Sequence, residues 1–103
     1  MSMDMTDPIK AARAAAEALR SLFDPTPLQR NDHLCMRFDA EIWLKREDLS
    51  PVRSYKLRGA FNAMRKVLVA TPDQQTFVCA SAGNHAQGVA YACRHFGRRG
   101  VIF

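Results

Sequence analysis

The chain has 103 residues, a formal net charge of +5 and 48% hydrophobic residues. This length suits one small domain, and the composition is that of a globular protein rather than a disordered or collagen-like chain. The basic residues are dispersed, so we expect no nucleic-acid face. Because no stretch approaches about 20 apolar residues and the start lacks an apolar core, we expect no membrane span, no signal peptide and a cytoplasmic location.

The N-terminal quarter is expected to be helical. Asp7 can cap a helix whose first residue is Pro8, and apolar residues recur at helical spacing as far as Phe23. Asp24-Pro25 ends this helix, and "PTPL" is expected to be an extended loop.

The middle of the chain predicts a short helix, a strand and a longer helix. Asn31 or Asp32 can cap the short helix, and "EIWLK" (41–45) is typical of a strand. A polar loop broken by Pro51 leads to a helix over residues 55–69. The apolar stripe of that helix is Leu57, Ala60, Phe61, Met64, Val67 and Leu68.

The last third predicts a βαβ unit. "TFVCA" (76–80) is typical of a buried strand, a turn follows, and a helix from Asn84 to Phe96 is closed by Gly97. "VIF" at the end begins a second strand, which should be parallel to the first with a right-handed crossover. We therefore expect an α/β fold with an open parallel sheet. Because the sequence stops three residues into a strand that needs covering on both faces, we expect a truncated, N-terminal piece of a longer protein.

The cysteines indicate neither a disulfide framework nor a metal site. Cys35, Cys79 and Cys93 are odd in number and form no CxxC pair, and no cluster has metal-ligand spacing. We expect small buried thiols.

The first motif that could take part in chemistry is Ser54-Tyr55-Lys56, at the start of the predicted long helix. A cation is disfavoured at that end of a helix, and Arg58 adds a second positive charge nearby. Both effects favour a neutral amine, which is the form that reacts with aldehyde cofactors. The alternative is an ordinary surface lysine.

The second motif is "SAGNHAQG" (81–88), between a strand and a helix. Small residues before a helix N-terminus present free backbone N–H groups, which bind anions. The pattern is neither GxGxxG nor a P-loop. Ser81 and Asn84 can equally serve as helix caps, and His85 as an ordinary first-turn residue. Together the two motifs suit an amino acid whose amine is held through an aldehyde cofactor and whose carboxylate is held by the loop.

"KREDLSPVRSYKLRGAFNAM" (45–64) followed by "SAGNHAQGVAYA" (81–92) resembles the threonine dehydratase (threonine ammonia-lyase) family. "TPLQRNDHL" (26–34) matches the early loop of that family, so the resemblance covers about residues 24–103. It implies the pyridoxal-phosphate fold type II, or tryptophan-synthase-β-like, architecture. "PVRSYK" (51–56) is similar to the dehydratase and serine racemase branch rather than to cysteine or threonine synthases, although position 55 is often phenylalanine there.

The resemblance implies that Lys56 is the Schiff-base lysine of pyridoxal 5'-phosphate and the base that removes the α-proton. Asn84 would hydrogen-bond the ring oxygen of the cofactor. Ser81, Gly83, Asn84 and His85 would form the loop that receives the substrate carboxylate. The glycine-rich phosphate loop and the partner of the pyridine nitrogen would lie beyond residue 103.

The resemblance further implies a lyase that deaminates L-threonine to 2-oxobutanoate and ammonia, on the route to isoleucine. Serine dehydratase, serine racemase and an inactive fragment remain alternatives. Residues 1–25 would be an N-terminal helix and 26–103 the cofactor-lysine and substrate-loop region of a catalytic domain whose remainder is missing. The whole protein is expected to be a homo-oligomer.

Overall fold

The computed structural model describes residues 7–103, so the expectations about residues 1–6, including the absence of a signal peptide, lie outside the described residues. In chain order the elements are α1 (Pro8–Leu19), β1 (Leu28–Arg30), α2 (Asp32–Phe38), β2 (Trp43–Lys45), the 3-10 turn η1 (Glu47–Leu49), α3 (Lys56–Ala70), β3 (Thr76–Cys79), α4 (Asn84–Phe96) and β4 (Arg99–Ile102).

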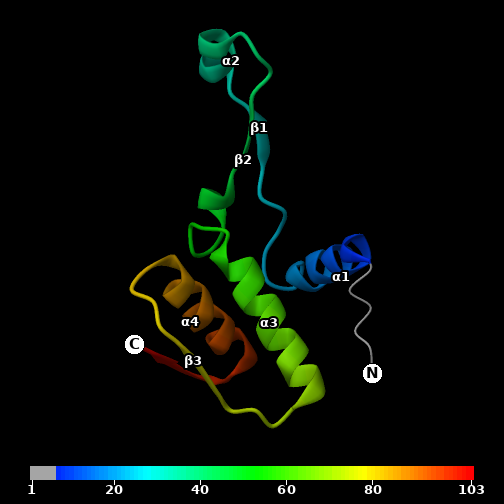
Figure 1. Ribbon diagram of the computed structural model, residues 1–103, viewed down its shortest axis with the longest axis vertical. Helices are drawn as coiled ribbons and strands as arrows, with labels where there is room; N and C mark the ends of the chain where they lie inside the picture. The colour runs from blue at the N-terminus through cyan, green and yellow to red at the C-terminus, as the bar shows by residue number, and fades with distance from the viewer. Residues whose placement is uncertain (1–6) are drawn as a thin grey trace.

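The described chain is elongated, with principal extents of 53 × 33 × 23 Å. Figure 1 shows a body made of α1, α3, α4 and the strands β3 and β4, and an arm made of β1 and β2 that carries α2 at its tip. No helix among residues 7–103 is long and apolar enough to cross a membrane.

Helix α1 begins as predicted but ends before Phe23. The side chain of Asp7 accepts a hydrogen bond from the N–H of Lys10, which confirms the predicted cap. The helix stops at Leu19 because the chain tightens there into i→i−3 bonds, with Leu22 N–H donating to Leu19 C=O at 2.9 Å.

The arm contains a strand that the sequence analysis missed. Residues 28–30 pair antiparallel with β2, so that Leu28 faces Lys45 and Arg30 faces Trp43. A three-residue strand depends on this distant partner, and its own sequence carries no periodic signal. Strand β2 is also two residues shorter at its start than predicted. Asn31 is the cap of α2, since its side chain accepts from the N–H of Leu34 at 2.9 Å.

Helices α3 and α4 lie side by side and hold the core. The predicted range of α3 agrees within one residue, and its residues Leu57, Ala60, Phe61 and Met64 are buried. Val67 is an exception: it is 40% exposed and lines a cavity beside β3. The body therefore buries the first two-thirds of the predicted stripe.

The last third forms the predicted βαβ unit. Strands β3 and β4 are parallel, with Val78 opposite Val101, and α4 has the predicted bounds. Gly97 ends α4 with φ at +63°, a conformation that favours glycine.

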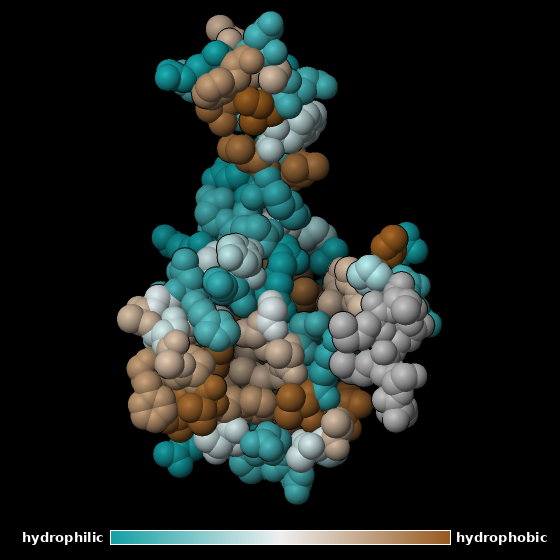
Figure 2. All heavy atoms as spheres, in the orientation of Figure 1, coloured by the Kyte–Doolittle hydropathy of each residue, from teal (hydrophilic) through white to brown (hydrophobic). Residues whose placement is uncertain are grey.

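Strand β3 is less buried than its sequence predicted. Val78 is 64% exposed, because the described residues cover only one face of this two-stranded sheet. Figure 2 shows hydrophobic residues at the surface of the lower end of the body, where these strands lie. Among the cysteines, Cys35 and Cys93 are buried as expected, Cys79 is half-buried, and all three are free thiols.

Candidate active site

Lys56 is the first residue of α3, which starts one residue later than the sequence predicted and keeps Lys56 in its first turn. It is half-buried, and its Nζ lies 5.2 Å from the centroid of the exposed Tyr55 ring. Tyr55 precedes the helix in helical geometry and offers no side-chain cap. The N–H of Lys56 donates instead to Ser54 Oγ, at a long 3.4 Å. The amine is thus carried by a helix start, next to an aromatic face that attracts cations.

The loop that leads to Lys56 is held by two buried serines. Ser50 Oγ donates to the Ser54 carbonyl at 2.8 Å and accepts from the Ser54 N–H at 3.2 Å. Between them Arg53 has φ at +60°, which is uncommon for a residue with a side chain. Because Ser50 Oγ both donates and accepts a buried hydrogen bond, these bonds resist movement of the loop that leads to Lys56.

A polar network ties the first turn of α3 to the base of the arm. Arg58 Nε lies 2.6 Å from Glu47 Oε2, and Arg58 Nη2 lies 2.9 Å from Glu47 Oε1. The hydroxyl of Thr26 donates to Glu47 Oε1 and accepts from Arg58 Nη2. This bidentate geometry is the strong form of an ion pair.

Within this network the positive charge of Arg58 is paired with the carboxylate of Glu47. From the sequence, Arg58 was expected to act as a second positive charge near Lys56, but in the structure its charge is balanced by Glu47. The hydrogen bond from Arg58 lowers the pKa of the Glu47 carboxyl to about 2, and the bond from Thr26 acts in the same direction. The pair therefore stays ionised at neutral pH.

The predicted substrate loop lies at the start of α4. Ser81 Oγ accepts from the N–H groups of Gly83 and Ala86, at 3.2 and 3.3 Å, so Ser81 shapes the turn. Gly83 is the N-cap residue and has no side-chain cap. Asn84 and His85 are the first two residues of the helix, and both are exposed.

The loop retains free donors. Among the hydrogen bonds of residues 7–103, none uses the N–H groups of Asn84 or His85. Such groups carry the positive end of the helix dipole and bind carboxylates. A Cβ built on Gly83 meets no atom within 4 Å, so the space above the turn is open. The loop can accept an anion from this side.

One contact joins the two parts of the site. A Cβ built on Gly88 would lie 3.1 Å from the backbone nitrogen of Leu57 and 3.1 Å from the carbonyl carbon and oxygen of Lys56. Gly88 is one helical turn beyond Asn84, so the start of α4 lies against the start of α3. The structure thus brings together the helix starts that carry Lys56 and the loop residues.

Sequence analysis missed Gly88, Glu47 and Thr26. Glycine inside a helix costs about 1 kcal/mol relative to alanine, so Gly88 did carry a signal of close packing. Glu47 and Thr26 carried none, because their partner Arg58 is 11 and 32 residues away in the chain.

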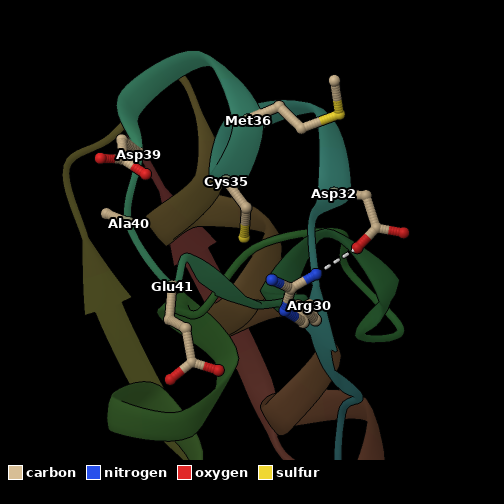
Figure 3. Close-up of a pocket in the computed structure, with 7 residues that line it drawn as sticks. All are labelled: Arg30, Asp32, Cys35, Met36, Asp39, Ala40 and Glu41. Atoms are coloured by element: carbon tan, nitrogen blue, oxygen red, sulfur yellow. Dashed lines mark hydrogen bonds and ion pairs between the residues drawn. The ribbon is translucent and has the colours of Figure 1, made fainter.

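The structure also has a hollow far from this site. A cavity of about 660 Å³ at the tip of the arm is lined by Arg30, Asp32, Cys35, Met36, Asp39, Ala40 and Glu41. Figure 3 shows Arg30 and Asp32 paired at its rim. None of the predicted site residues lines it. His85 instead lines a smaller apolar cavity of about 180 Å³ between α3, α4 and β3.

Comparison with known proteins finds similarity over most of the chain. The family model described as "Pyridoxal-phosphate dependent enzyme" matches residues 19–103. The chain is 50% identical over 95 residues to the biosynthetic L-threonine dehydratase IlvA of Bacillus subtilis, and the match covers 92% of the chain and 22% of that protein. The chain thus spans about a quarter of the length of the curated relatives it matches.

Two solved structures resemble the fold. The processed form of threonine deaminase isoform 2 from Solanum lycopersicum superposes with a TM-score of 0.80 and 31% identity, over 99% of this chain and 28% of that chain. A pyridoxal 5'-phosphate-dependent aspartate racemase superposes with a TM-score of 0.86 and 24% identity, over 91% and 30% of the two chains. At that identity the second likeness shows the fold alone.

Proposed function

The chain belongs to the family of pyridoxal-phosphate dependent enzymes, and from that premise we propose that it is the N-terminal portion of an enzyme that converts L-threonine to 2-oxobutanoate and ammonia. The proposal follows the activity for which relatives with 50% identity over the aligned residues are named. The structural observation that carries it is the contact between Gly88 and the Lys56–Leu57 peptide, which joins the lysine to the loop that would take the substrate carboxylate.

The residues present fit the cofactor. Lys56 belongs to no ion pair within residues 7–103, so its amine is not bound to a carboxylate of the described chain. Lys56 would hold the cofactor aldehyde through Nζ, and Asn84 would donate to the ring oxygen from the first turn of α4. The cofactor phosphate would be held by residues outside this chain.

The chemistry divides between cofactor and protein. When bound, pyridoxal phosphate supplies an electron sink for the negative charge left on the substrate α-carbon. Lys56 Nζ would then accept the α-proton as a general base. The N–H groups of Asn84 and His85 would hold the substrate carboxylate, so that the Cα–H bond points toward Lys56. The α-proton taken up by Lys56 Nζ and the β-hydroxyl would together be lost as water, and hydrolysis of the remaining enamine would release ammonia and the oxo acid.

The neighbouring contacts would keep Lys56 in place. Arg58 is one residue beyond Leu57 on α3 and is anchored by Glu47, while Ser50 and Ser54 stiffen the loop before it. A general base must stay within hydrogen-bond reach of the proton it removes, so this rigidity serves the reaction.

The test uses the whole protein that contains this chain. It is incubated with pyridoxal phosphate, reduced with borohydride and mapped by mass spectrometry. The adduct is expected on Lys56. Lys56→Ala is expected to lose both the yellow absorbance of the lysine-bound cofactor and the turnover of threonine. Lys66→Ala, which removes an exposed lysine from the same helix, is the matched control and should keep both. A Lys56→Ala protein that retains the adduct would refute the assignment.

Substrate preference is measured in the same preparation. Turnover of threonine is compared with that of serine, and the remaining serine is resolved by chiral chromatography. Faster oxo-acid formation from threonine supports the proposal. A preference for serine, or formation of D-serine without deamination, would assign the chain to a serine dehydratase or a serine racemase of the same fold.

A further inference from the structure

Glycine is needed at position 88 because there is no room for a side chain, and not because the backbone has a positive φ. It is buried within α4, and among the described glycines only Gly97 has a positive φ. A side chain at position 88 would meet three backbone atoms, the carbonyl carbon and oxygen of Lys56 and the nitrogen of Leu57, each at 3.1 Å. Backbone atoms cannot rotate away, so one of the two helices would have to move by a few tenths of an ångström.

The surrounding core limits which part can move. Leu57 is fully buried, and Val89 and Ala92 on α4 belong to the same buried cluster. Close-packed side chains transmit a displacement rather than absorb it. Strain at residue 88 is therefore expected to displace Lys56, which is only half-buried and is the first residue of α3.

Gly88 also lies close to the substrate loop. It follows Asn84 by four residues, and residues with that spacing share one face of a helix. The contact at Gly88 thus joins the helix start that carries Lys56 to the first turns of the helix that follows the loop.

We propose that Gly88 is a positioning residue: its lack of a side chain lets α4 lie against the Lys56–Leu57 peptide and thereby sets the distance from Lys56 Nζ to the loop at 81–85. The inference rests on the proposed function of Lys56 as the cofactor lysine. In this proposal Gly88 acts through the Lys56–Leu57 peptide and not through a contact with cofactor or substrate.

The test compares Gly88→Ala with Gly59→Ala in the whole enzyme. Gly59 lies on α3, three residues beyond Lys56, and a Cβ there meets no atom within 4 Å. Three quantities are measured for each: the affinity for pyridoxal phosphate from its absorbance, kcat and KM with threonine, and the unfolding temperature of the cofactor-free protein. Gly88→Val extends the series to a larger side chain.

A small misplacement of a reacting group lowers rates steeply, so Gly88→Ala is expected to weaken cofactor uptake and lower kcat by about tenfold, and Gly88→Val by about a hundredfold. The unfolding temperature of the cofactor-free Gly88→Ala protein should stay within a few degrees of Gly59→Ala. The loss should fall on kcat more than on KM, since the loop donors are intact.

Two results would overturn the inference. One is a Gly88→Ala protein whose cofactor affinity and kcat remain within twofold of Gly59→Ala. The other is a cofactor-free Gly88→Ala protein whose stability falls in parallel with its cofactor uptake, because Gly88 would then be merely structural. If the wild-type protein binds the cofactor on Lys56 but leaves threonine unchanged, the proposed function fails, and cofactor uptake alone still decides the role of Gly88.

Discussion

Glu47→Gln is expected to destabilise the protein by removing the charge that anchors Arg58. The substitution keeps the shape of the side chain and its ability to accept from Thr26. The contact of Arg58 Nε, at 2.6 Å, is lost because an amide nitrogen cannot accept a hydrogen bond, and the contact of Arg58 Nη2, at 2.9 Å, loses its ionic character. Because Arg58 belongs to the first turn of α3, the loss loosens the segment that carries Lys56.

The magnitude follows from the pKa of Glu47. The pKa falls from 4.5 to about 2, mainly through the hydrogen bond from Arg58. A fall of that size would correspond to about 3 kcal/mol of stability at neutral pH. The two side chains are 20% and 29% exposed, so water screens part of this interaction. We expect Glu47→Gln to cost about 2 kcal/mol at pH 7.

The pH dependence has a definite sign. The folded pKa of Glu47 is depressed, so its contribution is fully present above about pH 4.5 and is lost as pH falls through about 2. Urea unfolding followed by circular dichroism, at a series of pH values from 7 to 2.5, measures the difference between wild type and Glu47→Gln. That difference should shrink across the acid end of the series.

The control is Asp48→Asn, which removes an exposed ion pair to Arg46 and should leave the unfolding midpoint near that of wild type. A Glu47→Gln protein as stable as Asp48→Asn at pH 7 would refute the reasoning. So would a difference from wild type that stays constant down to pH 2.5.

Three further substitutions test the elements around the site. In urea unfolding, Arg53→Gly should stabilise the protein or leave its stability unchanged, because glycine adopts the φ of +60° without strain and this gain offsets the greater flexibility of the unfolded chain. Gly97→Ala, at a φ of +63°, should instead cost about 1 kcal/mol. A loss in Arg53→Gly as large as that in Gly97→Ala would show that the Arg53 side chain itself is needed. Leu57→Ala should cost about 3 kcal/mol by leaving a cavity where a fully buried side chain stood, and a loss below about 1 kcal/mol would contradict the core described for α3 and α4.

Some elements of the fold could be predicted because their signals are local. The bounds of α4 follow from the small residues before Asn84 and from Gly97 after Phe96. Helix α3 agrees within one residue because its apolar spacing is continuous from Leu57. The cap of α1 at Asp7 is likewise set by two adjacent residues.

Other elements could not be predicted, because their partners are distant in the chain. Strand β1 has three residues and exists through its ladder with β2. The exposure of Val67 and Val78 depends on what the rest of the body covers. Periodicity shows which residues can be buried, and the neighbouring elements decide which of them are.

The candidate site divides in the same way. The sequence by itself determined that Lys56 lies in the first turn of one helix and that the motif at 81–85 leads into another, since caps, glycines and apolar spacing act within a few residues. Only the tertiary structure decided that Gly88 lies against the Lys56–Leu57 peptide and that Glu47 neutralises Arg58. Those contacts join residues 32 and 11 positions apart, and their formation depends on the packing of whole elements rather than on any local preference of the chain.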